Sequence, residues 1–572
     1  MGINFFSEII NRFYFKNKIK FYFLIFLSLL AGFFEYMGLI LIFQFVLFLT
    51  NPTTLHCEKI ILFFQNQLNI SDFSKISLIL GIAIASIYIL KNIYMLIFTN
   101  FNNAILQDLS VKITTKTIKN LLFQDFVKVN SITNEEKLNL ISKISFVVWQ
   151  YCYKYINLLI NCAIALILLA YLFVKFTIPA FVATLFISIL AIVEYKFLKK
   201  NSTHQNKHFS VCFDEMNSLI LKIITSFKEI KLNNEQDYFV EKIEKKCLDY
   251  AILNKNRSFC DIFHIYFTEI SVMLAFILVL GILFYTTNFD NQLLITTIST
   301  ICVIILRLTP VINRAQSCLY SINSNKSLVL ELLEFDKKFG IDFEFLTTKE
   351  KLPFEKSIQL SKVFFAYKNN FVLENIDLKI NKGEFVGIVG KSGCSKTTLS
   401  LLLSGLIKPN QGEIFIDDKP LNKDDFQKWQ NNIALLSQDY AILFDNVENL
   451  NKEYVEKLNL KTNLKINEMS YGERQRLALA NVLNKDKEVL ILDEISSSCD
   501  VISEDKINDV LLNLKGQKTI IAIAHRLNIL KYCDKIIYMD NGKIIDIGDF
   551  KTLNNKYDEF RKMVELSAFK IN

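Results

Sequence analysis

Residues 384–399, EFVGIVGKSGCSKTTL, determine the fold of the second half of the chain. The apolar run Phe385–Val389 predicts a buried strand and Leu399–Leu406 predicts a helix, with a glycine- and serine-rich turn between them. Strand, turn and helix in this order are typical of a phosphate-binding loop, in which backbone N–H groups at a helix N-terminus point at the phosphates. We expect Lys396 to reach the β- and γ-phosphates of a nucleotide and the Thr397 hydroxyl to bind Mg²⁺.

One position in this loop departs from the pattern GxxxxGK[ST], because Ser395 stands where a glycine usually precedes the lysine. A side chain there is expected either to narrow the phosphate cradle or to force a positive φ, at a cost of about 1–2 kcal/mol. We expect the loop to bend and still bind nucleotide, and weakened binding or a degenerate site is the alternative. The other candidate contacts to phosphate are Gly390, Ser392, Gly393, Cys394 and Thr398.

A second motif, Val489–Glu494 (VLILDE), lies further along the chain. Its apolar run predicts a strand that ends in two carboxylates. We expect Asp493 to hold the Mg²⁺ shell and Glu494 to polarise an attacking water. Many buried strands end in acidic residues, so the motif gains its meaning from the phosphate-binding loop that precedes it.

Together these residues resemble the ATP-binding cassette family, and the resemblance covers nearly the whole chain. Residues 469–476 (MSYGERQR) are similar to the family's signature, LSGGQ followed by a basic helix. Ser470 and Gly472 match the signature, whereas Tyr471 and Glu473 depart from its commonest form. In this family the signature contacts the γ-phosphate held by the opposite subunit, so the resemblance implies a dimer with ATP and Mg²⁺ sandwiched between two copies.

Four further residues match motifs of this family. Tyr367 matches the aromatic residue that stacks on adenine, and Gln438 matches the glutamine that senses Mg²⁺ and contacts the membrane domain. Asp500 matches the D-loop aspartate, and His525 matches the switch histidine that contacts the γ-phosphate. Each of these residues taken singly is more often a packing residue, so their order and spacing carry the assignment. The implied catalytic residues are Glu494, His525 and Gln438, and the implied Mg²⁺ ligands are Thr397, Gln438 and Asp493.

The composition excludes several classes of protein. The 572-residue chain is 51% hydrophobic and 13% aromatic, with a mean hydropathy of +0.29, which excludes a disordered or small disulfide-stapled protein. The net charge of +8 is mild and dispersed, so we expect no nucleic-acid partner. The 11 cysteines include no CxxC pair, which argues against a zinc site or a disulfide framework.

Long apolar runs fill the first half of the chain and indicate membrane spans of about 20 residues each. The six runs lie at 21–48, 76–98, 156–174, 179–197, 262–286 and 292–312. Lysine and arginine concentrate in residues 1–20, 101–146 and 196–260, which places both termini and the long loops in the cytoplasm. We predict an α-helical membrane domain of six transmembrane helices (1–320), a charged linker (321–352) and an α/β P-loop ATPase domain (353–572), in the bacterial cytoplasmic membrane.

The six spans, the long cytoplasmic extensions and the order of the domains resemble the exporter branch of the family. In those proteins two short helices in the intracellular loops press on the nucleotide-binding domains. The candidates here lie near Phe126–Thr133 and Phe227–Glu235, and plain loop is the alternative for each.

Charged residues at lipid depth are functional candidates because they are expensive to place there. Glu35 in the first span, with Arg307 and Arg314 at the end of the sixth, could line a translocation path. A water-exposed position in a cytoplasmic extension is the alternative for Lys91, His264, Glu269 and Arg314.

The run Arg307–Arg314 (RLTPVINR), with a glutamate in the first span, resembles more weakly the lipid-linked oligosaccharide flippases of bacterial protein N-glycosylation. An anionic pyrophosphate-linked glycolipid would favour a basic ring in its path. We predict ATP-driven export or flipping of a lipid-linked or amphipathic substrate by a homodimer. The alternatives are a peptide or drug exporter, and a catalytically weak ATP-binding half of a heterodimer.

Overall fold

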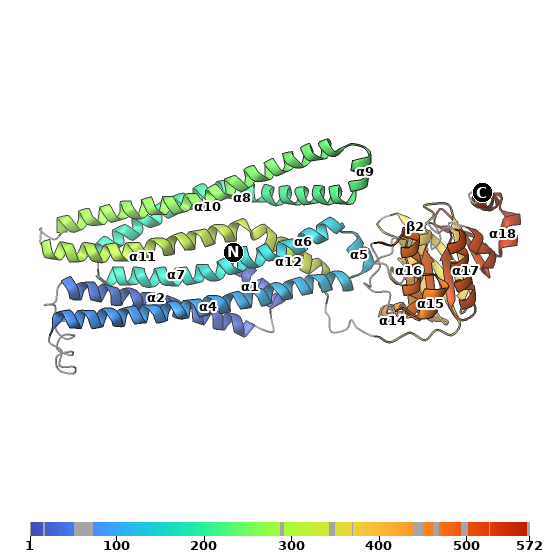
Figure 1. The fold of residues 1–572 in the computed structure, drawn as a ribbon, viewed down its shortest axis with the longest axis horizontal. Helices are drawn as coiled ribbons and strands as arrows, with labels where there is room; N and C mark the ends of the chain where they lie inside the picture. Colours follow the sequence, from blue (N-terminus) through green and yellow to red (C-terminus); the bar gives the residue numbers. More distant parts are fainter. Residues whose placement is uncertain are drawn as a thin grey trace. The chain divides into compact units, whose positions relative to one another are not determined.

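The computed structural model describes residues 2–14, 18–50, 72–175, 177–286, 291–341, 349–368, 370–438, 450–460, 468–493, 501–524 and 527–568. The chain divides into two compact units (Figure 1). Unit 1 comprises Met1–Phe123 and Ile132–Ile341, and unit 2 comprises Gln124–Ser131 and Asp342–Asn572.

Long helices dominate unit 1 (Figure 1). They are α2 (Lys18–Thr50), α4 (Phe73–Phe123), α7 (Tyr153–Lys175), α8 (Thr177–Thr225), α10 (Gln236–Thr286) and α11 (Asn291–Ser324). Each contains one of the predicted apolar runs, which confirms the helical N-terminal region. Helices α4, α8 and α10 have 51, 49 and 51 residues and therefore continue far beyond the length that a bilayer of about 30 Å requires.

Within the described residues, the segments Phe73–Phe123 and Ile265–Ile282 are long and apolar enough to cross a membrane, judged by length and composition. On α4 the apolar side chains of Ile82, Leu90 and Leu96 are exposed. Exposed apolar side chains repeated along one helix are expected where the helix faces lipid rather than water.

The long helices pack in pairs, α8 along α10, α7 along α11 and α2 along α4. The core of unit 1 includes Leu106 and Leu109 of α4 and Val148 of a π-helical turn, Val147–Cys152. That turn continues α6 (Asn134–Phe146), which begins in a reciprocal capping box.

Helix α12 (Lys326–Phe339) lies within the segment 321–352 that the sequence predicts as a charged linker. Its apolar stripe, including Val329 and Leu332, is buried in the core of unit 1. Asp336 is buried and accepts from Arg12 Nη1 of α1 (Gly2–Phe13) at 3.3 Å, and it pairs with Lys116 Nζ of α4 at 3.1 Å. The charged segment is therefore partly a packed helix, because its charges alternate with a helical apolar stripe.

Both segments that the sequence predicts as short intracellular-loop helices contain a helix in the structure. Helix α5 (Phe126–Asn130) belongs to unit 2, where Phe126 and Val127 pack against an apolar core. Its N-cap, Asp125, accepts a hydrogen bond from the Val127 N–H at 2.9 Å. Helix α9 (Phe227–Leu232) joins α8 to α10 in unit 1.

Unit 2 contains a six-stranded sheet in the order β10-β9-β3-β8-β7-β6. Its strands are β3 (Phe385–Gly390), β6 (Ile433–Leu436), β7 (Val489–Asp493), β8 (Thr519–Ile523), β9 (Lys535–Asp540) and β10 (Lys543–Gly548). All neighbours pair in parallel except β9 and β10, which are antiparallel. The predicted parallel α/β domain is confirmed, and the carboxyl ends of β3 and β7 meet at one edge of the sheet.

Both faces of this sheet are buried, so its central strands are apolar throughout rather than alternating. Leu490 and Leu492 of β7 lie in one core cluster with α16 (Tyr471–Asn484) and α17 (Val501–Leu514). Ile491 faces the opposite cluster with α13 (Lys396–Leu403).

A second sheet, in the order β2-β1-β4-β5, is antiparallel and was not distinguished in the sequence. It consists of β1 (Ser357–Ala366), β2 (Phe371–Asn381), β4 (Gln411–Ile416) and β5 (Lys419–Pro420). The remaining helices within the described residues are α14 (Phe426–Gln430), α15 (Lys452–Lys457), the 3₁₀ helix Leu527–Tyr532, α18 (Phe550–Lys556) and α19 (Asp558–Ala568).

Candidate functional site

The phosphate-binding loop lies between the end of β3 at Gly390 and the start of α13 at Lys396. Gly393 and Ser395 both have left-handed backbone conformations, with φ of 83° and 75°. Of the two outcomes considered for Ser395, the structure shows the positive φ, which for a residue with a Cβ costs about 1–2 kcal/mol. The turn thus keeps the backbone path of a glycine-containing loop at the expense of local strain.

Gly390 is required by close packing rather than by its φ. A Cβ at this position would lie 2.2 Å from the Met539 carbonyl oxygen and 2.6 Å from Cys394 Sγ. Burial raises the pKa of the Cys394 thiol, so this side chain stays neutral and packs beneath the loop. The Cys394 N–H donates to the Lys391 carbonyl oxygen at 3.2 Å within the turn.

Lys396 supplies an ammonium group and Thr397 supplies a hydroxyl group at the same edge of the sheet. The Lys396 ammonium donates to the carbonyl oxygens of Gly390 at 2.8 Å and Lys391 at 3.1 Å, so it bends back over the loop. The Thr397 hydroxyl donates to Asp493 Oδ2 at 2.9 Å, and Asp493 is buried at the end of β7. A hydroxyl and a carboxylate oxygen beside a lysine fit Mg²⁺ and the phosphates that it bridges.

Further predicted contacts are described in unit 2, and Ser392 of the loop is exposed. Thr398 is buried on the first turn of α13. Tyr367 follows β1, is 44% exposed and lies edge-on against Phe365 with ring centroids 4.9 Å apart. Gln438 lies in an exposed turn after β6.

Ser470 is the N-cap of α16 and forms a reciprocal capping box with Glu473. The Ser470 N–H donates to Glu473 Oε2 at 2.9 Å, and the Glu473 N–H donates to Ser470 Oγ at 3.3 Å. The departure at Glu473 therefore has a structural role, since Ser-x-x-Glu is the capping-box pattern. Tyr471 is exposed, and the Arg474 guanidinium lies 6.0 Å from the centroid of its ring.

Several predicted site residues lie outside what the structure describes. Glu494, Asp500 and His525 are outside the described residues, as are the side chains of Glu35, Arg307 and His264. Arg314 is described and exposed, and its Nε donates to the Pro310 carbonyl oxygen at 3.2 Å.

The charged residues in the apolar runs have contrasting environments. Lys91 is buried, with its Nζ 4.5 Å from the centroid of the Tyr88 ring, whereas Glu269 is exposed. Glu194 is not among the residues predicted from the sequence, and it is buried and accepts from Gln316 Nε2 at 3.0 Å. The available signal was that Glu194 is the single acidic residue in the apolar run 179–197.

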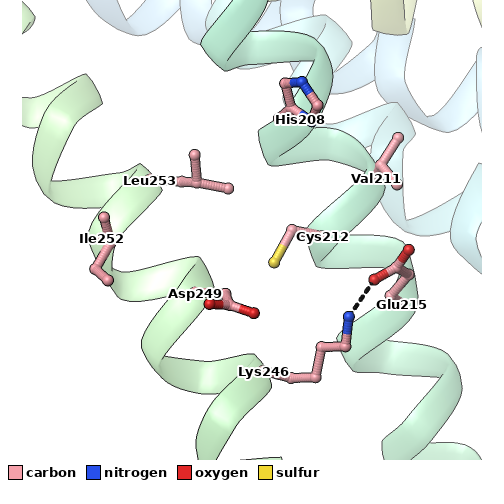
Figure 2. Close-up of a pocket in the computed structure, with 8 residues that line it drawn as sticks. All are labelled: His208, Val211, Cys212, Glu215, Lys246, Asp249, Ile252 and Leu253. Carbon is pink, nitrogen blue, oxygen red and sulfur yellow. Dashed lines mark hydrogen bonds and ion pairs between the residues drawn. The ribbon is translucent and has the colours of Figure 1, made fainter.

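A hollow of about 360 Å³ lies between α8 and α10 (Figure 2). Lys246 of α10 reaches across it to form an ion pair with Glu215 of α8. Burial raises the pKa of the Cys212 thiol at its edge, which keeps that thiol neutral. Within the described parts of the chain, no group of three or more His, Cys, Asp or Glu side chains is placed to hold a metal ion.

Comparison with known proteins is consistent with this geometry. Residues 373–497 match the family model described as ABC transporter. The chain is 33% identical over 232 residues to the ATP-dependent lipid A-core flippase of Alkalilimnicola ehrlichii, which covers 35% of this chain and 39% of that protein. It is 27% identical over 386 residues to the nisin transport ATP-binding protein NisT of Lactococcus lactis subsp. lactis, covering 61% and 63%. These matches thus span less than two thirds of the length of either relative.

A solved structure of a bacterial Atm1-family ABC exporter with ATP bound superposes with a TM-score of 0.75 at 16% sequence identity. The superposition covers 96% of this chain and 98% of that chain. Likeness at this low identity establishes the fold. The chain therefore carries an ABC transporter domain and has the fold of the ATP-binding cassette exporters.

Proposed function

We propose that the chain is an ATP-hydrolysing exporter or flippase of the bacterial cytoplasmic membrane that moves a lipid-linked or amphipathic substrate. The observation that carries this proposal is the convergence of Lys396, Thr397 and Asp493 at one edge of the parallel sheet. A lysine at a helix N-terminus and a hydroxyl–carboxylate pair provide for phosphate and Mg²⁺ at neighbouring positions. The long apolar helices of unit 1 supply the membrane part.

The residues of this chain have separate tasks in the proposed cycle. Lys396 and the loop amides bind the terminal phosphates. Thr397, Gln438 and Asp493 would hold Mg²⁺, which would neutralise phosphate charge when bound. Glu494 orients and deprotonates the attacking water, and His525 contacts the γ-phosphate. Tyr367 stacks on the base, which holds the nucleotide in register with these groups.

A second copy of the chain is part of the proposal. The turn of Ser470 and Gly472, with Asp500, would close over the nucleotide held by the opposite protomer. We propose a membrane domain of residues 1–320 and an ATP-binding domain of residues 353–572, joined by 321–352, of which α12 packs on unit 1 and only the remainder is linker. Both termini are proposed to lie in the cytoplasm. The charge of Arg307 and Arg314, doubled in a homodimer, would then line one pathway and favour an anionic headgroup.

ATP turnover by the purified chain in lipid nanodiscs tests the proposed chemistry. We expect Glu494→Gln to abolish turnover while MgATP binding is retained, because the substitution removes the base but not the phosphate cradle. Glu413→Gln, an exposed position on β4, is the matched control. Turnover that does not depend on Glu494 would instead support a catalytically weak half of a heterodimer.

The substrate class needs its own measurement. We expect ATPase stimulation in liposomes by a lipid-linked glycan or another amphipathic lipid, and little stimulation by peptides. Arg307→Ala should impair transport more than basal ATPase activity, because the side chain is proposed to contact cargo and not nucleotide. The alternative of a peptide exporter has support in the likeness to the nisin transport protein, and selective stimulation by peptides would establish it.

A further inference from the structure

Glu194 lies where α8, α10 and α11 meet, at the end of a chain of hydrogen bonds. Gln316 Nε2 of α11 donates to Glu194 Oε2 at 3.0 Å, and the Thr268 hydroxyl of α10 donates to Gln316 Oε1 at 2.5 Å. Glu194 is 4% exposed and Thr268 is 2% exposed. Three helices are thus joined through one buried carboxyl group and one amide.

The second carboxyl oxygen, Glu194 Oε1, is buried and has no hydrogen-bond partner among the described residues. Asn313 Oδ1 is also buried without a partner within that set, and Asn313 lies one helical turn before Gln316 on α11. A buried acceptor without a donor has lost its hydrogen bonds to water without forming others, which destabilises the folded state. Each of these two buried oxygens is therefore left without a donor by the described residues.

Among the described residues, the surrounding charged side chains do not supply that donor. On α8, Lys196 is exposed, and on α10, Glu269 is exposed while the side chain of His264 is outside the described set. On α11, Arg314 is exposed and donates to the Pro310 carbonyl oxygen. On α7, Lys154 is half-buried and is not a hydrogen-bond partner of Glu194 Oε1.

A buried carboxylate that accepts a single neutral hydrogen bond is poorly compensated. Adding one proton removes the charge and turns the oxygen that receives it from an acceptor into a donor. We propose that Glu194 is a proton-binding site that holds a proton on Oε1 while α8, α10 and α11 are packed as in this structure. The ligand is the proton itself, and the proposal goes beyond the nucleotide chemistry and does not depend on it.

Release of the proton follows from the same physics. When the three helices separate and water reaches the carboxyl group, the O–H bond breaks, the proton passes to water and a carboxylate remains. The packed arrangement therefore binds one proton more than the separated one, and lower pH favours the packed arrangement. Any cycle that packs and separates these helices would take up and release one proton at Glu194.

Infrared spectroscopy of the full chain in lipid nanodiscs without nucleotide tests this site directly. We expect a carbonyl-stretch band of a protonated carboxyl group at neutral pH, lost in Glu194→Gln and retained in the exposed control Glu269→Gln. The band should titrate as a single-proton transition. A band of the same intensity in Glu194→Gln would overturn the proposal, as would a wild-type spectrum without the band.

Two further variants keep the test decisive if Glu194→Gln does not fold. Gln316→Leu removes the amide that favours the charged carboxylate, so the transition should move to higher pH. A transition that stays in place in this variant contradicts the assignment. His264→Ala should leave the transition unchanged, and its loss there would assign the proton to the histidine instead.

Discussion

Ser395 and Ser470 both begin a helix, yet their turns are built in opposite ways. Ser395 precedes α13 with φ of 75° and ψ of 25°, and its side chain makes no cap hydrogen bond. Ser470 precedes α16 with φ of −61° and ψ of 163°, and it takes part in a reciprocal capping box with Glu473. The same residue type thus stands in a strained turn in one place and in a relaxed, self-satisfied turn in the other.

The turn at Ser395 leaves its helix N-terminus without a side-chain cap, so a ligand can bind there, whereas the turn at Ser470 is capped by its own helix. Strain at Ser395 keeps the loop in the backbone path of a glycine-containing turn before α13, and the N-terminus of a helix favours a phosphate. At Ser470 the Glu473 carboxylate already occupies the place of an anion at the helix N-terminus. If both turns close on one nucleotide, the first is ready for it, and the second must exchange its own carboxylate for a phosphate.

Removing the lysine of the strained turn should have the largest effect. Lys396→Ala deletes the ammonium that is proposed to bind the terminal phosphates, at a cost of about 2–3 kcal/mol, or on the order of 100-fold in MgATP affinity. Calorimetric titration with MgATP measures the change, and Lys419→Ala on the exposed strand β5 is the control. Unaltered affinity in Lys396→Ala would remove this loop from the nucleotide site.

Replacing each serine by alanine should then distinguish the two turns by stability. Ser470→Ala removes a cap and should destabilise unit 2 by about 1 kcal/mol, whereas Ser395→Ala loses no cap hydrogen bond and should change stability little. Thermal unfolding without nucleotide compares the two variants. Equal losses would show that the contrast between the turns has no energetic basis.

Neutralising Glu473 should make the Ser470 turn a better binding site for phosphate. Glu473→Gln retains a capping oxygen and removes a negative charge worth about 0.5–1 kcal/mol at a helix terminus. We expect ATP-dependent dimer closure to need a several-fold lower ATP concentration, as measured by cross-linking, because no carboxylate opposes the phosphate. Glu453→Gln, in the first turn of α15, is the matched control. If Glu473→Gln needs more ATP instead, the carboxylate helps closure and does not compete with it.

Much of unit 2 could be predicted because its signals are local. The strand, turn and helix around Lys396 lie within a short stretch, and a close succession of residues fixes each part. The pattern Ser470-x-x-Glu473 was equally local, but comparison with a consensus made it look like a departure when it was a capping signal. The signature consensus describes which residues are common at these positions, whereas the hydrogen bonds that Ser470 and Glu473 can form explain why they stand here.

The parts of unit 1 that escaped prediction depend on contacts between distant segments. Glu194 and Gln316 are 122 positions apart, so no periodicity of either helix reveals that they meet. The many charges of α12 favour a linker, whereas the structure buries Asp336 and the apolar stripe of this helix. Burial of a charge depends on which helix packs over it, and that information is absent from the local sequence.

The smallest predicted effect tests the strain itself. Ser395→Gly should relieve about 1–2 kcal/mol of left-handed strain and add about 0.5–1 kcal/mol of unfolded-state entropy, for a net stabilisation of roughly 0.5–1 kcal/mol. In a domain of this size that corresponds to a rise in melting temperature of about 2 °C, measured for unit 2 in the full chain. Gly393→Ser is the matched control. Gly393 also has a positive φ and has open space around its Cβ position, so the added side chain should lower stability through backbone strain alone. A Ser395→Gly variant that melts earlier would mean that the hydroxyl, and not the backbone, holds this turn in place.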